Sequence, residues 1–159
     1  MKMKKFFAAT CFSLLISVLS HAQITEGTDG VFYDQNNKPY NGTYNEYYNS
    51  GKTKSIIDFN NGLPEGISKF YFENGNLKEV KSYKFGLKDG IWITYNEKSN
   101  KTAEASYLAG QKDGKWLVYD EDNHLIWDMT YSEGKRTGVW FEYNAEGEVV
   151  TQKDYNTTH

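Results

Sequence analysis

The sequence predicts an all-β protein, an elongated single-sheet antiparallel meander of stacked β-hairpin repeats. The first observation is a 24-residue period that occurs five times between Tyr40 and Tyr155. The second is that β-branched and aromatic residues fill the segments between regularly spaced glycines, which suits strands. The third is that none of these segments keeps apolar residues at helical spacing. A fixed period of this length is typical of repeat architectures.

Four columns of residues carry the period. The first column is Gly42, Gly66, Gly90, Gly114 and Gly138. The second column is Gly62, Gly86, Gly110 and Gly134. The third column is Tyr47, Tyr71, Tyr95, Tyr119 and Tyr143, and the fourth is Phe59, Tyr83, Tyr107, Tyr131 and Tyr155. Paired glycines four residues apart predict a turn whose backbone needs φ > 0 or close approach.

The third copy illustrates the unit. Residues 91–95 are β-branched and aromatic and predict one strand, and residues 101–107 predict a second. The polar segment 96–100 between them predicts a hairpin turn. Residues 110–114 then turn into the next copy. Each unit is therefore expected to be one β-hairpin.

The hairpin turns differ among the copies. Gly51, Gly75 and Gly147 occupy one turn position, whereas Ser99 and Asn123 replace glycine there. We expect the two turns without glycine to be distorted, because glycine adopts left-handed backbone at the lowest cost.

Side-chain alternation predicts aromatic rows on both faces of the sheet. Three tryptophans lie three residues before the tyrosine column: Trp92, Trp116 and Trp140. An odd spacing places the two sets on opposite faces unless a bulge intervenes. The tryptophans should lie about 10 Å apart, because each strand adds about 4.8 Å, so other residues must fill their row. Equal parity also predicts Leu77 and Tyr83 on one face.

The N-terminus has the pattern of a secretory signal peptide. Lys2, Lys4 and Lys5 precede the apolar segment 6–19, and Ser20 and Ala22 are small residues at the −3 and −1 positions of a cleavage site. We predict export with cleavage near Ala22; an uncleaved anchor is the alternative. The single cysteine lies early in the apolar segment, where it does not fit a lipoprotein signal.

The period divides the rest of the chain. We predict a signal peptide at 1–22, an N-terminal arm with a capping half-repeat at 23–41, five repeats at 42–155 and a tail at 156–159. The half-repeat includes an expected strand at Val31–Tyr33. Repeat arrays need an atypical end to shield the first buried face.

Charge and residue content argue against several functions. Residues 1–22 hold three of the 18 basic residues and none of the 21 acidic ones, so the exported chain carries 15 basic and 21 acidic residues, a formal charge of −6. This charge argues against nucleic acid or strong membrane binding. His124 and His159 have no neighbours suited to catalysis. Residues 120–123 suit either a weak Ca²⁺ site or a polar turn, and we favour the turn. We predict no catalytic, cofactor or metal residues.

The repeat resembles the MORN repeat variant common in exported bacterial proteins. The matching segments are Tyr40–Tyr44 (YNGTY), Asp113–Trp116 (DGKW) followed by Tyr119, and Glu73–Lys78 (ENGNLK). Ser68 departs from the pattern, because other copies carry an aromatic residue there. The resemblance implies an elongated, curled antiparallel sheet and a role in scaffolding, tethering or partner binding. Some bacterial relatives carry an antitoxin label.

Together these observations predict an exported, non-catalytic interaction scaffold of the periplasm or cell exterior, with an unknown protein as partner. One alternative is a carbohydrate-binding module that uses exposed aromatic rows, and another is antitoxin-like partner binding. The candidate binding residues are Trp92, Trp116 and Trp140. The alternative, which we favour, is that the three residues simply pack against their neighbours in the row, and their exposure distinguishes the two roles.

Overall fold

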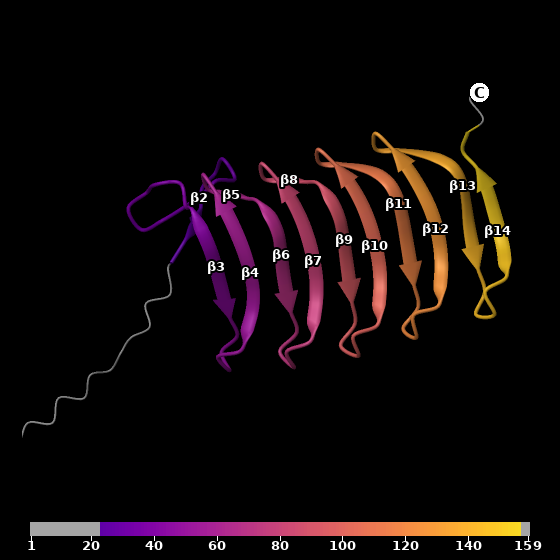
Figure 1. Cartoon of the computed structure of the whole chain (residues 1–159), viewed down its shortest axis with the longest axis horizontal. Coiled ribbons are helices and arrows are strands. Elements are labelled where there is room, and N and C mark those ends of the chain that lie inside the picture. Colours follow the sequence, from indigo (N-terminus) through magenta and orange to yellow (C-terminus); the bar gives the residue numbers. More distant parts are fainter. Residues whose placement is uncertain (1–22, 157–159) are drawn as a thin grey trace, which may run out of the picture.

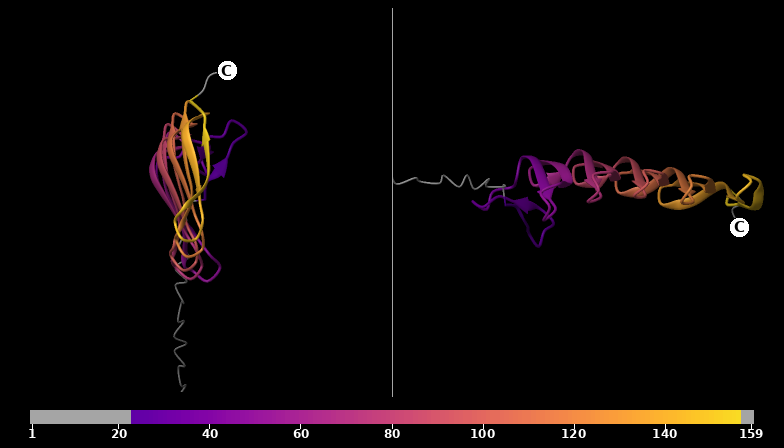
Figure 2. Two further views of the ribbon diagram at one scale, coloured as in Figure 1. Left: turned by 90° about the vertical axis from the view of Figure 1, so that its right-hand side faces the viewer. Right: turned by 90° about the horizontal axis from the view of Figure 1, so that it is seen from below.

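A computed structural model describes residues 23–156 of the chain. The predicted signal peptide and residues 157–159 of the tail lie outside the described residues. Within residues 23–156 every regular element is a β-strand. The strands form a long sheet of a single layer, seen face-on in Figure 1 and from two further directions in Figure 2. The predicted all-β class and single-sheet architecture are confirmed.

Fourteen strands are formed by the described residues. They are β1 (Thr25–Glu26), β2 (Phe32–Tyr33), β3 (Gly42–Tyr47), β4 (Thr53–Asn60), β5 (Leu63–Pro64), β6 (Gly66–Tyr71), β7 (Leu77–Lys84), β8 (Leu87–Lys88), β9 (Gly90–Tyr95), β10 (Lys101–Leu108), β11 (Gln111–Tyr119), β12 (Leu125–Ser132), β13 (Lys135–Tyr143) and β14 (Val149–Asp154).

The strands pair in the order in which they occur along the chain. The main sheet runs from β3 to β14, with β5 paired to β4 and β8 paired to β7. Every pairing is antiparallel, so the predicted meander is confirmed. In the later copies one strand, β11 or β13, spans the positions that two strands, such as β5 and β6, occupy earlier. Strands β1 and β2 form a separate two-stranded sheet.

One edge of the sheet, uppermost in Figure 1, consists of two-residue turns. Both residues of each turn have positive φ: Asn61 and Gly62, Phe85 and Gly86, Ala109 and Gly110, Glu133 and Gly134. This is the conformation of a type I′ hairpin, whose twist matches that of the flanking strands. The first glycine column also has positive φ, from 68° at Gly138 to 119° at Gly42. The predicted left-handed backbone is confirmed in both columns.

The turns at the opposite edge are alike in all copies. Ser99 and Asn123 have φ of 70° and 69°, close to the 80° of Gly51. The N–H of Ser99 donates to the carbonyl of Asn96 at 2.9 Å, which is the bond that Gly75 makes to Phe72. The predicted distortion is therefore wrong. The side chain of Asn96 stabilises its turn, because its Oδ1 accepts hydrogen bonds from the backbone N–H groups of residues 98 and 100.

A β-bulge follows each of these turns. Tyr71 pairs with Leu77 and Phe70 with Glu79, so Lys78 is an extra residue without a partner in the register. The same register shift recurs at Lys54, Thr102, Ile126 and Val150. Because an extra residue reverses the alternation, Leu77 and Tyr83 lie on opposite faces. The prediction that they share a face is wrong for this reason.

The sheet has little buried core. Among the described residues only four non-glycine side chains are buried: Phe59 and Trp140, which are 6% and 9% exposed, and Ser55 and Ser68. Within residues 23–156 no second layer covers the faces of the long sheet, so about half of the side chains are half-buried. Stability must therefore come from contacts between neighbours within each face. At the N-terminal end, the ring of Phe32 in β2 lies 4.9 Å from that of Phe59.

Candidate functional site

Seven aromatic rings form one continuous row, which we call the aromatic ladder. They are Tyr83, Trp92, Tyr107, Trp116, Tyr131, Trp140 and Tyr155. Successive ring centroids are 4.7–5.3 Å apart, with the ring planes inclined by 51–63°. Such tilted pairs are favourable beyond the area they bury. The tyrosines of the fourth column thus fill the spaces between the three tryptophans, as the strand spacing predicted.

The ladder tryptophans are also held by hydrogen bonds. Nε1 of Trp92 donates to the carbonyl of Ser82 at 2.8 Å, and Nε1 of Trp116 donates to that of Ser106 at 3.0 Å. Trp140 makes the equivalent bond to Thr130. Trp140 is buried, and the other two tryptophans are half-buried. These contacts are those of packed side chains. A binding role for the three tryptophans stays a prediction.

Cations lie over the ladder, and three of them stand two residues before Gly90, Gly114 and Gly138 in consecutive copies. Lys81 and Lys153 also lie over ladder rings. The ammonium of Lys88 lies 4.4 Å from the Trp92 centroid, and that of Lys112 lies 3.9 Å from the Trp116 centroid. The guanidinium of Arg136 lies 5.0 Å from the Trp140 ring. Lys88, Lys112 and Arg136 each also lie over the next tyrosine along the row. The ring faces of the ladder are therefore occupied by neighbouring rings and by cations.

Burial affects the ionisation of two ladder tyrosines. Loss of solvent raises the pKa of Tyr83 above its ordinary value, and the nearby Glu79 adds to the effect. Burial also raises the pKa of Tyr107, opposed by the positive charges of Lys112 and Lys81. Both hydroxyls are thus neutral at physiological pH. The positive charge over the ladder comes from the lysines and the arginine alone.

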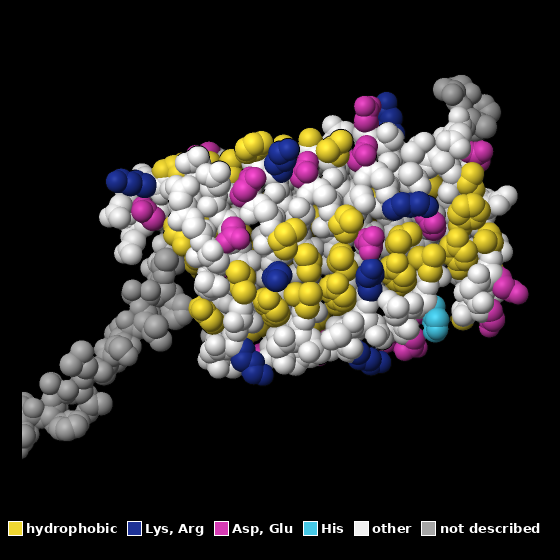
Figure 3. All heavy atoms as spheres, viewed as in Figure 1, with side chains coloured by type: hydrophobic (Ala, Val, Ile, Leu, Met, Phe, Trp, Pro, Cys, Tyr) yellow, Lys and Arg dark blue, Asp and Glu magenta, His cyan; other side chains and the backbone are white. Residues whose placement is uncertain are grey.

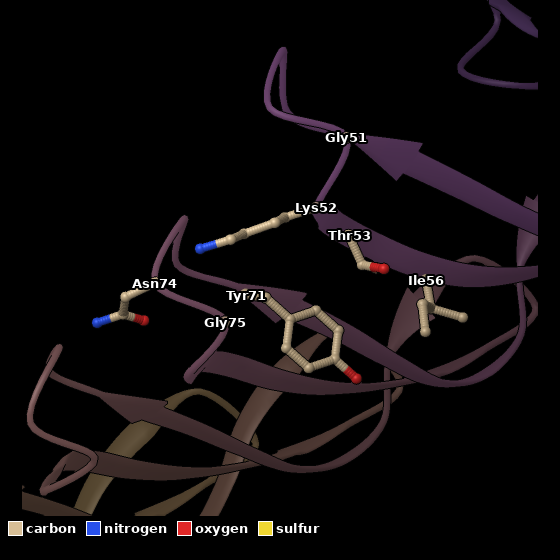
Figure 4. Close-up of a pocket in the computed structure, with 7 residues that line it drawn as sticks. All are labelled: Gly51, Lys52, Thr53, Ile56, Tyr71, Asn74 and Gly75. Atoms are coloured by element: carbon tan, nitrogen blue, oxygen red, sulfur yellow. The ribbon is translucent and has the colours of Figure 1, made fainter.

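The third-column tyrosines lie on the face opposite the aromatic ladder. The sequence predicted opposite faces for Trp92 and Tyr95, because they lie three residues apart in a strand that has no bulge between them. Beside Tyr71 this face holds a hollow of about 490 Å³ (Figure 4). It is lined by Gly51, Lys52, Thr53, Ile56, Tyr71, Asn74 and Gly75. The ammonium of Lys52 reaches the next copy and donates to the carbonyl of Glu73 at 2.9 Å. This contact joins two repeats and leaves no charged group directed into the hollow.

An apolar patch lies on the two-residue-turn edge, and we call it the turn patch. It consists of Phe85, Leu87 and Leu108, which are 68%, 51% and 59% exposed. Hydrophobic side chains are visible along this edge at the top of Figure 3. Phe85 has φ of 51°, which is unusual for a bulky residue. Sequence reasoning missed the patch. The available signal was a phenylalanine at the turn position that Asn61 occupies in the preceding copy.

The acidic segment 120–123 forms a hairpin turn. Oδ1 of Asp120 accepts the N–H groups of Asp122 and His124, and Oδ2 lies 2.9 Å from Nδ1 of His124. The backbone bond from His124 is the main reason that the pKa of Asp120 is lowered, and the side-chain bond to Asp120 raises the pKa of His124. Residues 23–156 contain no group of three or more His, Cys, Asp or Glu side chains arranged for a metal ion. That segment likewise contains no helix able to span a membrane.

These features define a repeat protein of stacked β-hairpins. Residues 40–61 and 64–85 match the family model of the MORN repeat variant. These two segments are therefore similar to MORN repeats, and proteins built from this repeat are generally non-catalytic. The third, fourth and fifth copies repeat the same glycine columns and the same bulge outside the matched segments. A search of curated proteins found no match.

Proposed function

We propose that this protein is an exported, non-catalytic scaffold that binds a protein partner in the cell envelope or exterior. The match of residues 40–61 and 64–85 to the MORN repeat variant supports a binding role. The basic, apolar and small-residue pattern of residues 1–22 supports export. The turn patch supplies the surface on which a partner protein binds.

The observation that carries the proposal is the conformation and exposure of Phe85. A non-glycine residue in left-handed backbone costs on the order of 1 kcal/mol or more. Asparagine tolerates this conformation best and occupies the equivalent position 61. Phe85 adopts this conformation with φ of 51°, and its side chain remains 68% exposed. Contacts of the ring within the chain therefore offset little of the conformational free energy. Burial of this ring against a partner would offset the conformational cost, and aromatic anchors often dominate binding energy.

The surroundings of Phe85 suit the centre of a small interface. Leu87 and Leu108 extend the apolar surface, and the outer turns at residues 60–61 and 132–133 are polar. An exposed apolar patch with a polar rim is typical of protein interaction sites. A sugar ring, by contrast, stacks on a free aromatic face, and the faces of the aromatic ladder already carry Lys88, Lys112 and Arg136. The turn patch therefore favours a protein partner over carbohydrate.

The test replaces Phe85 by asparagine and compares the proteins recovered with the wild type and the variant from the cell envelope. Phe85→Asn should leave the melting temperature unchanged or raise it, because asparagine suits the turn. It should also remove a specific partner. Ala109→Asn is the matched control, because it makes the same change one repeat later and should retain that partner. Recovery of the same proteins with Phe85→Asn and the wild type would refute the role of the turn patch.

A further inference from the structure

Five cationic side chains lie over rings of the aromatic ladder, and we call them the ladder cations. They are Lys81, Lys88, Lys112, Arg136 and Lys153. Three of them recur every 24 residues, so each lies two strands, or about 10 Å, from the next. Strands β7 to β14 stand side by side along the sheet (Figure 1). The ladder cations therefore form a row across these strands.

Most of the ladder cations are not neutralised by a carboxylate. Within residues 23–156 only one of them forms an ion pair, Lys81 with Glu79 at 2.9 Å. Arg136 donates one hydrogen bond, to the hydroxyl of Tyr155 at 3.1 Å. The other three contact rings and form neither an ion pair nor a side-chain hydrogen bond among the described residues. A lysine ammonium has three N–H donors, so these groups can still bind an anion.

The rings hold the cations in regular positions. The ammonium of Lys112 lies 3.9 Å from the centroid of Trp116 and 4.7 Å from that of Tyr131. Lys88 makes the equivalent pair of contacts one repeat earlier. A long side chain that is already held loses less conformational freedom when a ligand binds. The row is thus preorganised for a ligand whose anionic groups recur at the same spacing.

The ladder also presents hydroxyl groups beside the cations. The hydroxyls of Tyr107 and Tyr131 form no hydrogen bond among the described residues, and neither oxygen is buried. A neutral phenol both donates and accepts a hydrogen bond. Because Lys88 lies over Tyr107 and Lys112 over Tyr131, a cation and an accessible hydroxyl lie together in consecutive repeats.

We infer that the ladder cations bind a linear acidic polysaccharide, whose carboxylates pair with the cations while its hydroxyls bond to the ladder tyrosines. The sugar rings need no free aromatic face, because they are held by charge and not by stacking. Regular spacing favours a polymer with a repeating unit over an acidic peptide, and the accessible hydroxyls favour a sugar over a lipid surface. This inference is independent of the turn patch and of its protein partner.

The rest of the chain makes such binding specific to the row. Residues 23–159 contain 15 basic and 21 acidic residues, so the chain as a whole repels polyanions. Binding of an acidic polymer must therefore depend on where the ladder cations lie and not on net charge.

The test titrates the purified protein with hyaluronan oligosaccharides, which are linear and carry one carboxylate in every disaccharide. In calorimetry the affinity should rise by at least about tenfold from the disaccharide to the hexasaccharide, because a longer chain engages several cations at once. Added salt should weaken the binding. Neutral dextran should not bind. Absence of hyaluronan binding, or an affinity that does not rise with length, would overturn the inference.

Two triple variants locate the binding. One combines Lys88→Gln, Lys112→Gln and Arg136→Gln, and it should weaken hexasaccharide binding by at least about tenfold. The matched control combines Lys69→Gln, Lys84→Gln and Lys135→Gln. It removes the same charge from side chains outside the ladder cations, and it should bind as the wild type does. Equal weakening by the two variants would overturn the inference, because net charge alone would then explain the binding.

Two further probes represent the other classes of anion, namely poly-glutamate for an acidic peptide and phosphatidylglycerol vesicles for a lipid surface. Both should bind more weakly than hyaluronan. Binding of either probe without binding of hyaluronan would overturn the choice of a polysaccharide.

A measurement on the wild type keeps the test decisive if the first triple variant fails to fold. The hexasaccharide should shift the indole N–H resonances of Trp92, Trp116 and Trp140 in NMR spectra, because the cations that bind it lie over these rings. The backbone amides of the hairpin turn at residues 73–75 should not move. Shifts confined to the hairpin turns would overturn the inference.

Discussion

The carboxylate of Asp113 accepts a hydrogen bond from the backbone N–H of Glu133 at 3.0 Å, and this contact joins one repeat to the next. Glu133 is the first residue of a two-residue turn and has φ of 49°. Equivalent bonds, each spanning 20 residues, join Asn61 to Asn41, Phe85 to Glu65 and Ala109 to Asp89. The residue before each of the first four first-column glycines thus holds the two-residue turn that lies 20 residues later. In a repeat array such contacts between neighbours determine stability.

We predict that Asp113→Ala lowers the free energy of unfolding by about 1 kcal/mol, the usual worth of one hydrogen bond. Asp113→Asn should cost much less, because Asn41 makes the equivalent bond at 2.7 Å with an amide oxygen. Urea unfolding of the two variants measures the difference. Equal losses for the two variants would mean that charge, and not the hydrogen bond, matters here.

Gly114 is constrained by its backbone and by its neighbour. Its φ is 89°, and a Cβ added there would lie 3.1 Å from Cβ of Ser106. We predict that Gly114→Val lowers the free energy of unfolding by more than about 1 kcal/mol, because β-branched residues are strained in this region. Gly66→Val is the control, since Gly66 has φ of 74° but open space around its Cβ position. It should cost less than Gly114→Val in the same urea titration. No loss for Gly114→Val would contradict the backbone argument.

The 24-residue period was sufficient to predict the hairpins, the glycine turns and the spacing of Trp92 from Trp116. These features repeat, so each copy supports the others. The bulge at Lys78 could not be predicted, because an extra residue leaves no mark in a pattern of alternating side chains. That error placed Leu77 on the wrong face. The hydrogen bond from Glu133 to Asp113 was also missed, since a bond across 20 residues depends on the register of two turns.

The candidate sites were less predictable than the fold. The spacing of the three tryptophans was visible in the sequence. The positions of Lys112 and the other cations over the rings were not, because they depend on the conformations of long side chains. Ser68 was noted as a departure from the repeat. A cavity beside Phe59 could not be predicted, because its lining residues come from five strands and the N-terminal segment. Nothing in the sequence distinguished Phe85 from other aromatic residues, because its positive φ and high exposure are known only from the structure.

Export predicts a defined mature N-terminus. Mass spectrometry of the periplasmic or secreted fraction should find a chain that begins at Gln23, because Ser20 and Ala22 fit the cleavage site. A variant with Ala22→Arg should remain uncleaved, since signal peptidases need a small residue before the cut. Recovery of the wild type as an intact chain that begins at Met1 would rule out cleavage.

The pair of Asp120 and His124 predicts a pH effect of known sign. His124 has a pKa raised from 6.5 by its bond to Asp120, so the pair stabilises the fold fully below the unfolded pKa of His124. This contribution is lost as pH rises through the folded pKa, which lies above the ordinary value of 6.5. An NMR titration should give His124 a pKa above its ordinary value in the wild type and close to it in Asp120→Asn. The asparagine retains the acceptor for the backbone N–H of His124, so the turn should persist. An unchanged pKa in the variant would exclude the pair as its cause.

Trp116 decides whether the aromatic ladder is a packing or a binding element. Its ring contacts Tyr107 and Tyr131 at 5.2 and 5.3 Å, and Lys112 covers it. Trp116→Ala should therefore lower the free energy of unfolding by about 3 kcal/mol, the cost of removing a large packed aromatic residue. Trp116→Phe retains a ring but loses the hydrogen bond to Ser106, so it should cost about 1 kcal/mol. The melting temperature and the recovered partner proteins should be measured side by side. If Trp116→Ala left the melting temperature unchanged and removed a partner, the ladder would be a binding surface; if both stayed unchanged, the row would serve neither role.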